Sequence, residues 1–235
     1  MVLPAKIFEI KEDTVPRDMI ESMRRFRHEE PYELADGGEI SLVTQILDIE
    51  QDESLISGVF SKDILREQYY RRRIVETPTT EEAPFWITPH GERSFLIVMA
   101  PSVARGVKKL LTNHVANSLS EILYGKVGFI VESRIPNDVL KDLHESNPQA
   151  TNLIWFDDVD LPGVKKLCLA GEGLSDTNLY KEYLDHGKIW YVVFEAKKRG
   201  VTVGITRSCV VTLFSRSTVD EFVQLLSEDL LGLID

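Results

Sequence analysis

Hydrophobic and polar positions in the first half of the chain follow two spacings, one typical of strands and one of helices. Alternate residues share one face of a strand, whereas every third or fourth residue shares one face of a helix. On this basis strands are predicted over residues 6–11, 40–49, 55–60, 85–88 and 93–100. Helices are predicted from Thr14 through Phe26 and from Ser102 through Leu123, with Thr14 and Ser102 as N-caps and Gly125 as the stop of the second helix.

Three polar segments in this half are assigned from composition. Residues 61–75 carry charges on both faces, and although Ser61 is a candidate N-cap for a helix there, an extended conformation is favoured. Residues 77–84, TPTTEEAP, are predicted to form a polar loop. The basic run at residues 24–27 is placed on the first helix, with Phe26 on the buried face of that helix.

The second half of the chain shows the same kinds of pattern. Strands are predicted over residues 127–133, 153–156 and 164–169, followed by a hairpin of residues 189–197 and 201–214. Helices are predicted to begin at Pro136, Ser175 and Thr218. Thr218 has Glu221 three residues later, which is the spacing of a capping box.

The order of these elements predicts an α+β protein. We expect two similarly laid-out halves of mixed or antiparallel sheet, with helices packed on one face. The boundary is placed near residues 124–126. This gives an N-terminal α+β domain, 1–124, that ends in a long helix, and a C-terminal α+β domain, 125–235, that ends in a capped helix. Because no residue-level repeat is visible, a duplication is only a hypothesis.

The chain of 235 residues has a formal net charge of −11, from 27 Lys and Arg against 38 Asp and Glu. An acidic surface disfavours nucleic-acid binding over the whole molecule but leaves room for a local basic groove. The sequence shows no hydrophobic signal region and no apolar run of about 20 residues, the length needed to cross a bilayer. Cys168 and Cys209 lie in strand-like segments and are interpreted as reduced core residues. We therefore expect a cytoplasmic protein without a membrane partner.

One short stretch interleaves basic and aromatic residues. It contains Arg66, Tyr69, Tyr70, Arg71, Arg72 and Arg73. Arginine pairs with phosphates and tyrosine stacks on unpaired bases, so this stretch is the leading candidate for a nucleic-acid contact. The alternative is that the arginines protect an edge strand from aggregation or pair with acidic residues at 50–53 or 81–82.

A second candidate lies at the end of an apolar strand, IWYVVFEAKKRG. Its Glu195 and Lys197 are two positions apart and so share a face if both are in the strand. The stretch resembles the second half of the PD-(D/E)xK nuclease motif. The resemblance implies that Glu195 ligates Mg²⁺ and Lys197 stabilises the attacking hydroxide or the phosphate. The leading aspartate of that motif is not clearly placed; the candidates are Asp157, Asp158, Asp160 and Asp185.

No other motif indicates a specific chemistry. The histidines at 28, 90, 114, 144 and 186 lack the spacing of a zinc site, and His114 is interpreted as a packing residue. We therefore predict a non-catalytic binding protein with nucleic acid as the leading ligand, and with no metal and no cofactor. The first alternative is a magnesium-dependent nuclease, and only this alternative requires a cofactor, Mg²⁺. An oligomeric adaptor or structural protein that binds copies of itself is the second.

Overall fold

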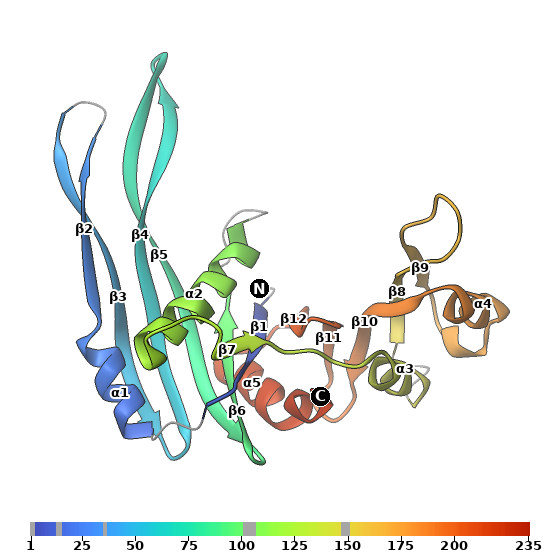
Figure 1. Cartoon of the computed structure of the whole chain (residues 1–235). Helices are drawn as coiled ribbons and strands as arrows, with labels where there is room; N and C mark the ends of the chain where they lie inside the picture. The colour runs from blue at the N-terminus through green and yellow to red at the C-terminus, as the bar shows by residue number, and fades with distance from the viewer. Residues whose placement is uncertain (1–2, 13–15, 35–36, 101–106, 147–150) are drawn as a thin grey trace. The chain divides into compact units, whose positions relative to one another are not determined.

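The structure is a computed structural model that describes residues 3–12, 16–34, 37–100, 107–146 and 151–235 (Figure 1). The chain divides into two compact units, one of Glu9–Val131 and one of Met1–Phe8 with Glu132–Asp235. Two strands, β1 (Leu3–Ile10) and β7 (Ile130–Glu132), contain residues of both units. The predicted domains 1–124 and 125–235 stay a prediction.

Twelve strands and five α-helices are present among the described residues, and the strands pair mostly antiparallel. The mixed α+β class is thus confirmed. The finer expectation, of two similar halves with helices on one face, stays a prediction.

The unit Glu9–Val131 is built on an antiparallel sheet. Its strands pair in the order β2 (Arg27–Glu33), β3 (Glu39–Asp52), β4 (Leu55–Tyr70), β5 (Arg73–His90) and β6 (Arg93–Met99). The long strands β4 and β5 pair from Ile56 opposite Ile87 to Tyr70 opposite Arg73. Figure 1 shows that their hairpin extends well beyond the two helices of this unit.

Those two helices pack against the part of the sheet that lies away from the β4–β5 turn (Figure 1). Helix α1 (Pro16–Arg25) buries Met19 and Met23, and α2 (Val107–Tyr124) buries Val115 and Leu119. Helix α1 contacts α2 and β3, and α2 contacts β5 and β6. The predicted stop at Gly125 is confirmed, since this glycine has a φ of 75° and its N–H donates to the carbonyl of Glu121. The predicted N-caps Thr14 and Ser102 lie outside the described residues.

Two predictions in this unit are wrong because strand pairing overrides local composition. Residues 77–84 are not a loop but part of β5, paired with β4 from Thr77 opposite Arg66 to Pro84 opposite Val59. Strand β6 pairs with β5 only from Phe85 onward, so β5 is an edge strand before that point and tolerates Pro78 and Pro84. The first helix ends at Arg25, so Phe26 follows it and Arg27 begins the edge strand β2. The extended conformation favoured for residues 61–75 is confirmed except at residues 71–72, which form the turn between β4 and β5.

The second unit also contains an antiparallel sheet. Its strands pair in the order β1, β12 (Val210–Leu213), β11 (Val201–Thr206), β10 (Lys188–Ala196), β8 (Thr151–Asp157) and β9 (Leu167–Ala170). The predicted hairpin across Gly200 is confirmed, but its second strand is interrupted between Thr206 and Val210, where Cys209 has a φ of 55°. Cys209 is buried, whereas the interpretation of Cys168 as a core residue is wrong because it is exposed.

Three helices belong to this unit: α3 (Asn137–Glu145), α4 (Asn178–His186) and α5 (Val219–Gln224). The predicted capping box is present at α5, where the side chains of Thr218 and Glu221 each accept the other's backbone N–H. The apolar turns that follow α5 bury Leu230, Leu231 and Ile234. The end of the chain is therefore part of the core of its own unit.

Candidate nucleic-acid interface

A two-residue turn of Arg71 and Arg72 joins β4 to β5 at the end of the long hairpin. Both residues have left-handed backbone conformations, with φ values of 46° and 66°. A turn with two left-handed residues matches the twist of the paired strands, and Asn-Gly is the favoured sequence for it. An L-residue with a Cβ in this conformation costs on the order of 1 kcal/mol. The turn thus holds two arginines where local backbone energetics favour other residues.

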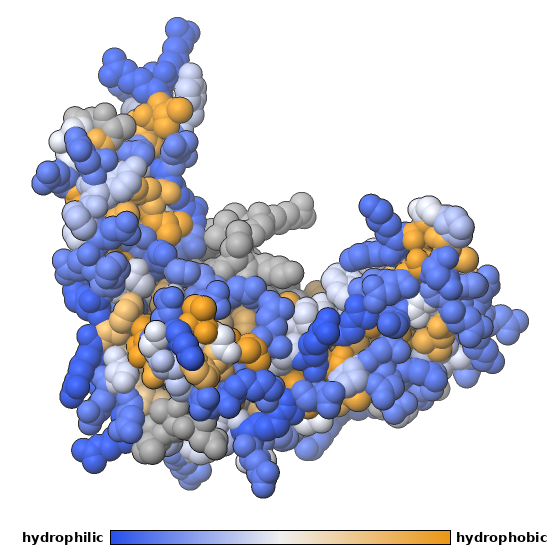
Figure 2. Space-filling model, viewed as in Figure 1, coloured by the Kyte–Doolittle hydropathy of each residue, from blue (hydrophilic) through white to orange (hydrophobic). Residues whose placement is uncertain are grey.

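The residues around this turn are unusually exposed. Tyr69 is 76% and Tyr70 60% accessible, and Ile74 is 64% accessible. The Arg71 guanidinium lies 5.2 Å from the centroid of the Tyr70 ring, in cation–π geometry. Figure 2 shows hydrophilic atoms at the end of the hairpin, with a hydrophobic patch directly below them. Aromatic rings, apolar side chains and guanidinium groups are therefore available together to a ligand.

The register of the hairpin separates its end into two faces. Tyr70 lies opposite Arg73, whereas Tyr69 lies on the neighbouring pair, opposite Ile74. Glu67 and Glu76 form a directly opposed pair two positions below Tyr69. Because opposed residues share a face and successive pairs alternate, Tyr70 and Arg73 lie on one face and Tyr69 lies on the other with the two glutamates.

The acidic face, which carries Glu67 and Glu76, also makes a hydrogen bond within the unit Glu9–Val131. The hydroxyl of Tyr32 on β2 donates a hydrogen bond of 3.0 Å to Glu76. This hydrogen bond raises the pKa of the Tyr32 phenol, with burial and the charge of Glu76 acting in the same direction. The basic face, which carries Tyr70 and Arg73, is the one with chemistry suited to a polyanion.

Arg66 lies apart from the turn. Its guanidinium forms an ion pair of 2.6 Å with Glu81, whose side chain is only 9% exposed. One of the alternatives weighed for the basic stretch, pairing with the acidic residues at 81–82, therefore applies to this arginine. The structure brings Tyr70, Arg71, Arg72 and Arg73 together, and we call these four residues the hairpin tip.

The structure places Glu195 and Lys197 in different elements. Glu195 is an exposed residue of β10 opposite Thr202, while β10 ends at Ala196 and Lys197 lies in the following turn. The expected shared strand face is therefore wrong.

Three of the aspartates considered as partners of Glu195 have other partners. Asp157 and Asp158 pair with Arg207 at 3.0 and 3.5 Å, and Asp160 pairs with His186 at 2.8 Å. Within the described ranges, no group of three or more His, Cys, Asp and Glu side chains is arranged to hold a metal ion. The nuclease alternative stays a prediction.

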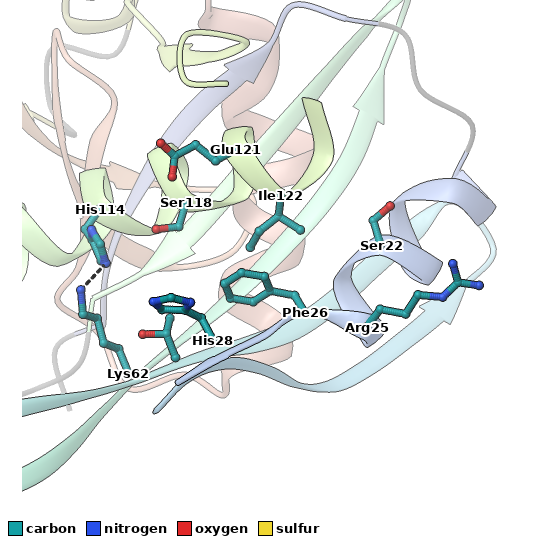
Figure 3. A pocket seen from close by; sticks show the side chains of 10 residues that line it. Ser22, Arg25, Phe26, His28, Lys62, His114, Ser118, Glu121 and Ile122 are labelled. Atoms are coloured by element: carbon teal, nitrogen blue, oxygen red, sulfur yellow. Dashed lines mark hydrogen bonds between the residues drawn. The ribbon is translucent and has the colours of Figure 1, made fainter. Parts of the chain in front are cut away.

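A pocket in the unit Glu9–Val131 was not foreseen from the sequence. Its volume is about 660 Å³ (Figure 3). It is lined by Ser22, Arg25, Phe26, His28, Thr44, Lys62, His114, Ser118, Glu121 and Ile122. These residues come from α1, β2, β3, β4 and α2, or from the link between α1 and β2, so only the folded sheet and helices bring them together.

The closest polar contact in this pocket joins two basic side chains. The Lys62 Nζ lies 3.0 Å from the His114 Nε2. Burial lowers the pKa of His114, the Lys62 ammonium lowers it further, and Glu121 acts in the opposite direction. A neutral His114 accepts the hydrogen bond that Lys62 donates. The imidazole also packs edge-on against Phe60, with ring centroids 5.7 Å apart.

No family model matches the chain, and no curated protein matches it significantly. No helix in the described part of the chain is long and apolar enough to cross a membrane.

Proposed function

We propose that this protein is a non-catalytic binding protein that contacts single-stranded nucleic acid through the hairpin tip. The observation that carries the proposal is the turn of two arginines in left-handed conformations, next to the exposed ring of Tyr70. Backbone strain in an exposed turn is most readily understood when the side chains held there have a role.

The chemistry of the tip fits this ligand class. Guanidinium groups form bidentate contacts with phosphates, and a tyrosine ring provides a face on which an unpaired base stacks. Stacking on an exposed ring requires no particular base, so binding with little sequence preference is expected.

The charge of the remaining chain limits where the ligand lies. The net charge is −11, and Glu67 and Glu76 lie on the opposite face of the same hairpin. Repulsion from these groups confines a polyanion to the tip and to the face that carries Tyr70 and Arg73.

Fluorescence anisotropy with a labelled single-stranded oligonucleotide tests this proposal. Three arginine contacts predict that the logarithm of the association constant falls with the logarithm of salt concentration with a slope of about −2. The double variant Arg71→Gln/Arg73→Gln is expected to flatten this slope to about −0.7. The double variant Arg17→Gln/Arg24→Gln removes the same charge from α1 and is the matched control.

The two tyrosines provide a second comparison. Tyr70→Ala is expected to weaken binding by about tenfold through lost stacking. Tyr69→Ala removes a more exposed ring from the face that carries Glu67 and Glu76 and is expected to have a smaller effect. An affinity independent of salt, or an equal loss in the α1 control variant, would contradict the proposal.

A further inference from the structure

The pocket in the unit Glu9–Val131 has a floor built by three neighbouring strands. His28 on β2 lies opposite Thr44 on β3, and Thr44 lies opposite Lys62 on β4. Directly opposed residues share a face, so the three side chains form a row across the sheet. Helix α2 lies over this row and supplies His114 and Ser118, which are one helical turn apart. Figure 3 shows Lys62 and His114 together at one end of the pocket, beside His28.

The charge in this pocket is incompletely compensated. Lys62 lies directly opposite Glu81 on β5, but among the described residues that carboxylate forms its ion pair with Arg66. The close polar neighbour of the Lys62 ammonium is the imidazole of His114. The only carboxylate among the described lining residues is Glu121. A half-buried ammonium without a carboxylate partner favours the binding of an anion.

Arg25 also lines the pocket, but its positive charge is already paired with a carboxylate. Its guanidinium pairs with Glu21 at 3.3 Å, and Figure 3 shows its side chain directed away from Lys62, His28 and His114. The positive charge of the pocket therefore comes from Lys62, and the imidazoles of His28 and His114 lie at the same end.

The remaining lining residues indicate what accompanies the anion. Hydroxyl groups are available from Thr44, Ser118 and Ser22, and the ring of Phe26 faces Ile122 across the pocket (Figure 3). The volume of about 660 Å³ is in the range of pockets that hold small organic ligands and is much larger than an inorganic anion needs. An organic group with a flat apolar part fits the end lined by Phe26 and Ile122.

We propose that this pocket binds a phosphomonoester of mononucleotide size, with Lys62 and His114 contacting the phosphate and Phe26 contacting the organic group. This inference does not depend on nucleic-acid binding at the hairpin tip. The phosphate belongs either to a free nucleotide or to the phosphorylated end of a strand, and both present the same group to Lys62.

Isothermal titration of the full chain with AMP, with adenosine and with inorganic phosphate tests the proposal. AMP is expected to bind at least about tenfold more tightly than adenosine, because only AMP reaches Lys62 with a charge. Lys62→Met is expected to weaken AMP binding by about tenfold, and Lys62→Arg to retain most of it. Lys126→Met removes the same charge outside the pocket and is expected to leave AMP binding unchanged. Equal affinities for AMP and adenosine, or no binding of AMP at millimolar concentration, would overturn the proposal.

The imidazole of His114 gives a readout in the unaltered protein, identified by comparing its NMR signals with those of His114→Gln. The titratable groups on the elements around it are Lys62 on β4, His28 on β2, Glu121 on its own helix and, opposite Lys62, Glu81 on β5. A bound phosphate dianion opposes the effect of Lys62, so AMP is expected to raise the pKa of His114. A pKa that AMP leaves unchanged contradicts the placement of the phosphate.

Competition distinguishes the two sources of the phosphate and separates this proposal from the first one. If an oligonucleotide displaces AMP only when its 5′ end is phosphorylated, the ligand is a strand end; if neither form displaces AMP, it is a free nucleotide. Displacement by an unphosphorylated oligonucleotide contradicts recognition of a phosphomonoester. The variant Arg71→Gln/Arg73→Gln is expected to bind AMP normally, so failure of one proposal does not conceal the other.

Discussion

Replacement of the arginine turn by Asn-Gly should move stability and affinity in opposite directions. In the variant Arg71→Asn/Arg72→Gly the backbone keeps its two left-handed residues, with φ values of 46° and 66° in the native protein. Glycine relieves the strain at the second position and asparagine part of it at the first, which together gives on the order of 1–2 kcal/mol. The same variant removes two positive charges from the candidate interface.

The stabilisation is expected first in the hairpin itself, because β5 has no second partner strand before Phe85. Amide hydrogen exchange is therefore the appropriate measurement. Exchange of the backbone amides of Tyr70 and Arg73 is expected to slow by about tenfold, the equivalent of about 1.4 kcal/mol. Oligonucleotide affinity is expected to fall, with a salt slope reduced by about 1.4.

A charge-preserving variant, Arg71→Lys/Arg72→Lys, separates the two effects. It keeps the strain and the positive charge, so both the exchange rates and the salt slope are expected to stay near those of the native protein. Faster exchange in the Asn-Gly variant would refute the argument from backbone strain. Undiminished affinity in that variant would refute the assignment of the two arginines to binding.

Three predictions concern the unit that contains the chain's C-terminus. Gly204→Ala places a Cβ 2.1 Å from the Tyr191 hydroxyl oxygen, so chemical denaturation should show a loss of about 1–3 kcal/mol, whereas no loss would show that the ring moves freely. Burial lowers the pKa of His144, so as pH falls below about 6.5 the unfolded chain takes up a proton that the folded chain does not. The free energy of unfolding should therefore decrease by up to about 1.4 kcal/mol per pH unit, and His144→Phe should abolish that contribution; an unchanged pH slope in the variant would contradict it. Lys6 is buried beside the half-exposed carboxylate of Glu132, so Glu132→Ala should destabilise by up to about 3 kcal/mol and Lys6→Met by clearly less. The reverse order would show that the buried ammonium does not depend on that carboxylate.

Elements defined by local signals were predicted well from the sequence. The capping box of Thr218 and Glu221 and the stop at Gly125 each depend on residues close together in the chain. The strands at residues 27–33 and 77–84 were missed because their composition is polar and proline-containing, and only pairing with distant residues makes them strands.

The candidate sites show the same limit. The extended conformation around Tyr70 was predicted, and it already places Tyr69 and Tyr70 on opposite faces, but only the register of the hairpin shows that Arg73 shares the face of Tyr70. The phosphate pocket was not predicted at all, because His28 and Lys62 are adjacent only through Thr44 on the strand between them. The residues next to His28 or Lys62 in the sequence give no sign that the two lie on neighbouring positions of one sheet face.

Arg66 lies on β4 between Lys62 and Tyr70, and its ion-pair partner Glu81 lies directly opposite Lys62. Lys62 and Tyr70 are eight positions apart on an extended strand, a span of about 26 Å. Mobile ions screen charges beyond about 8 Å at physiological ionic strength, a distance well short of this span. The charges of the hairpin tip and of Lys62 are therefore screened from each other. Each site is expected to keep its own ligand affinity whether or not the other is occupied.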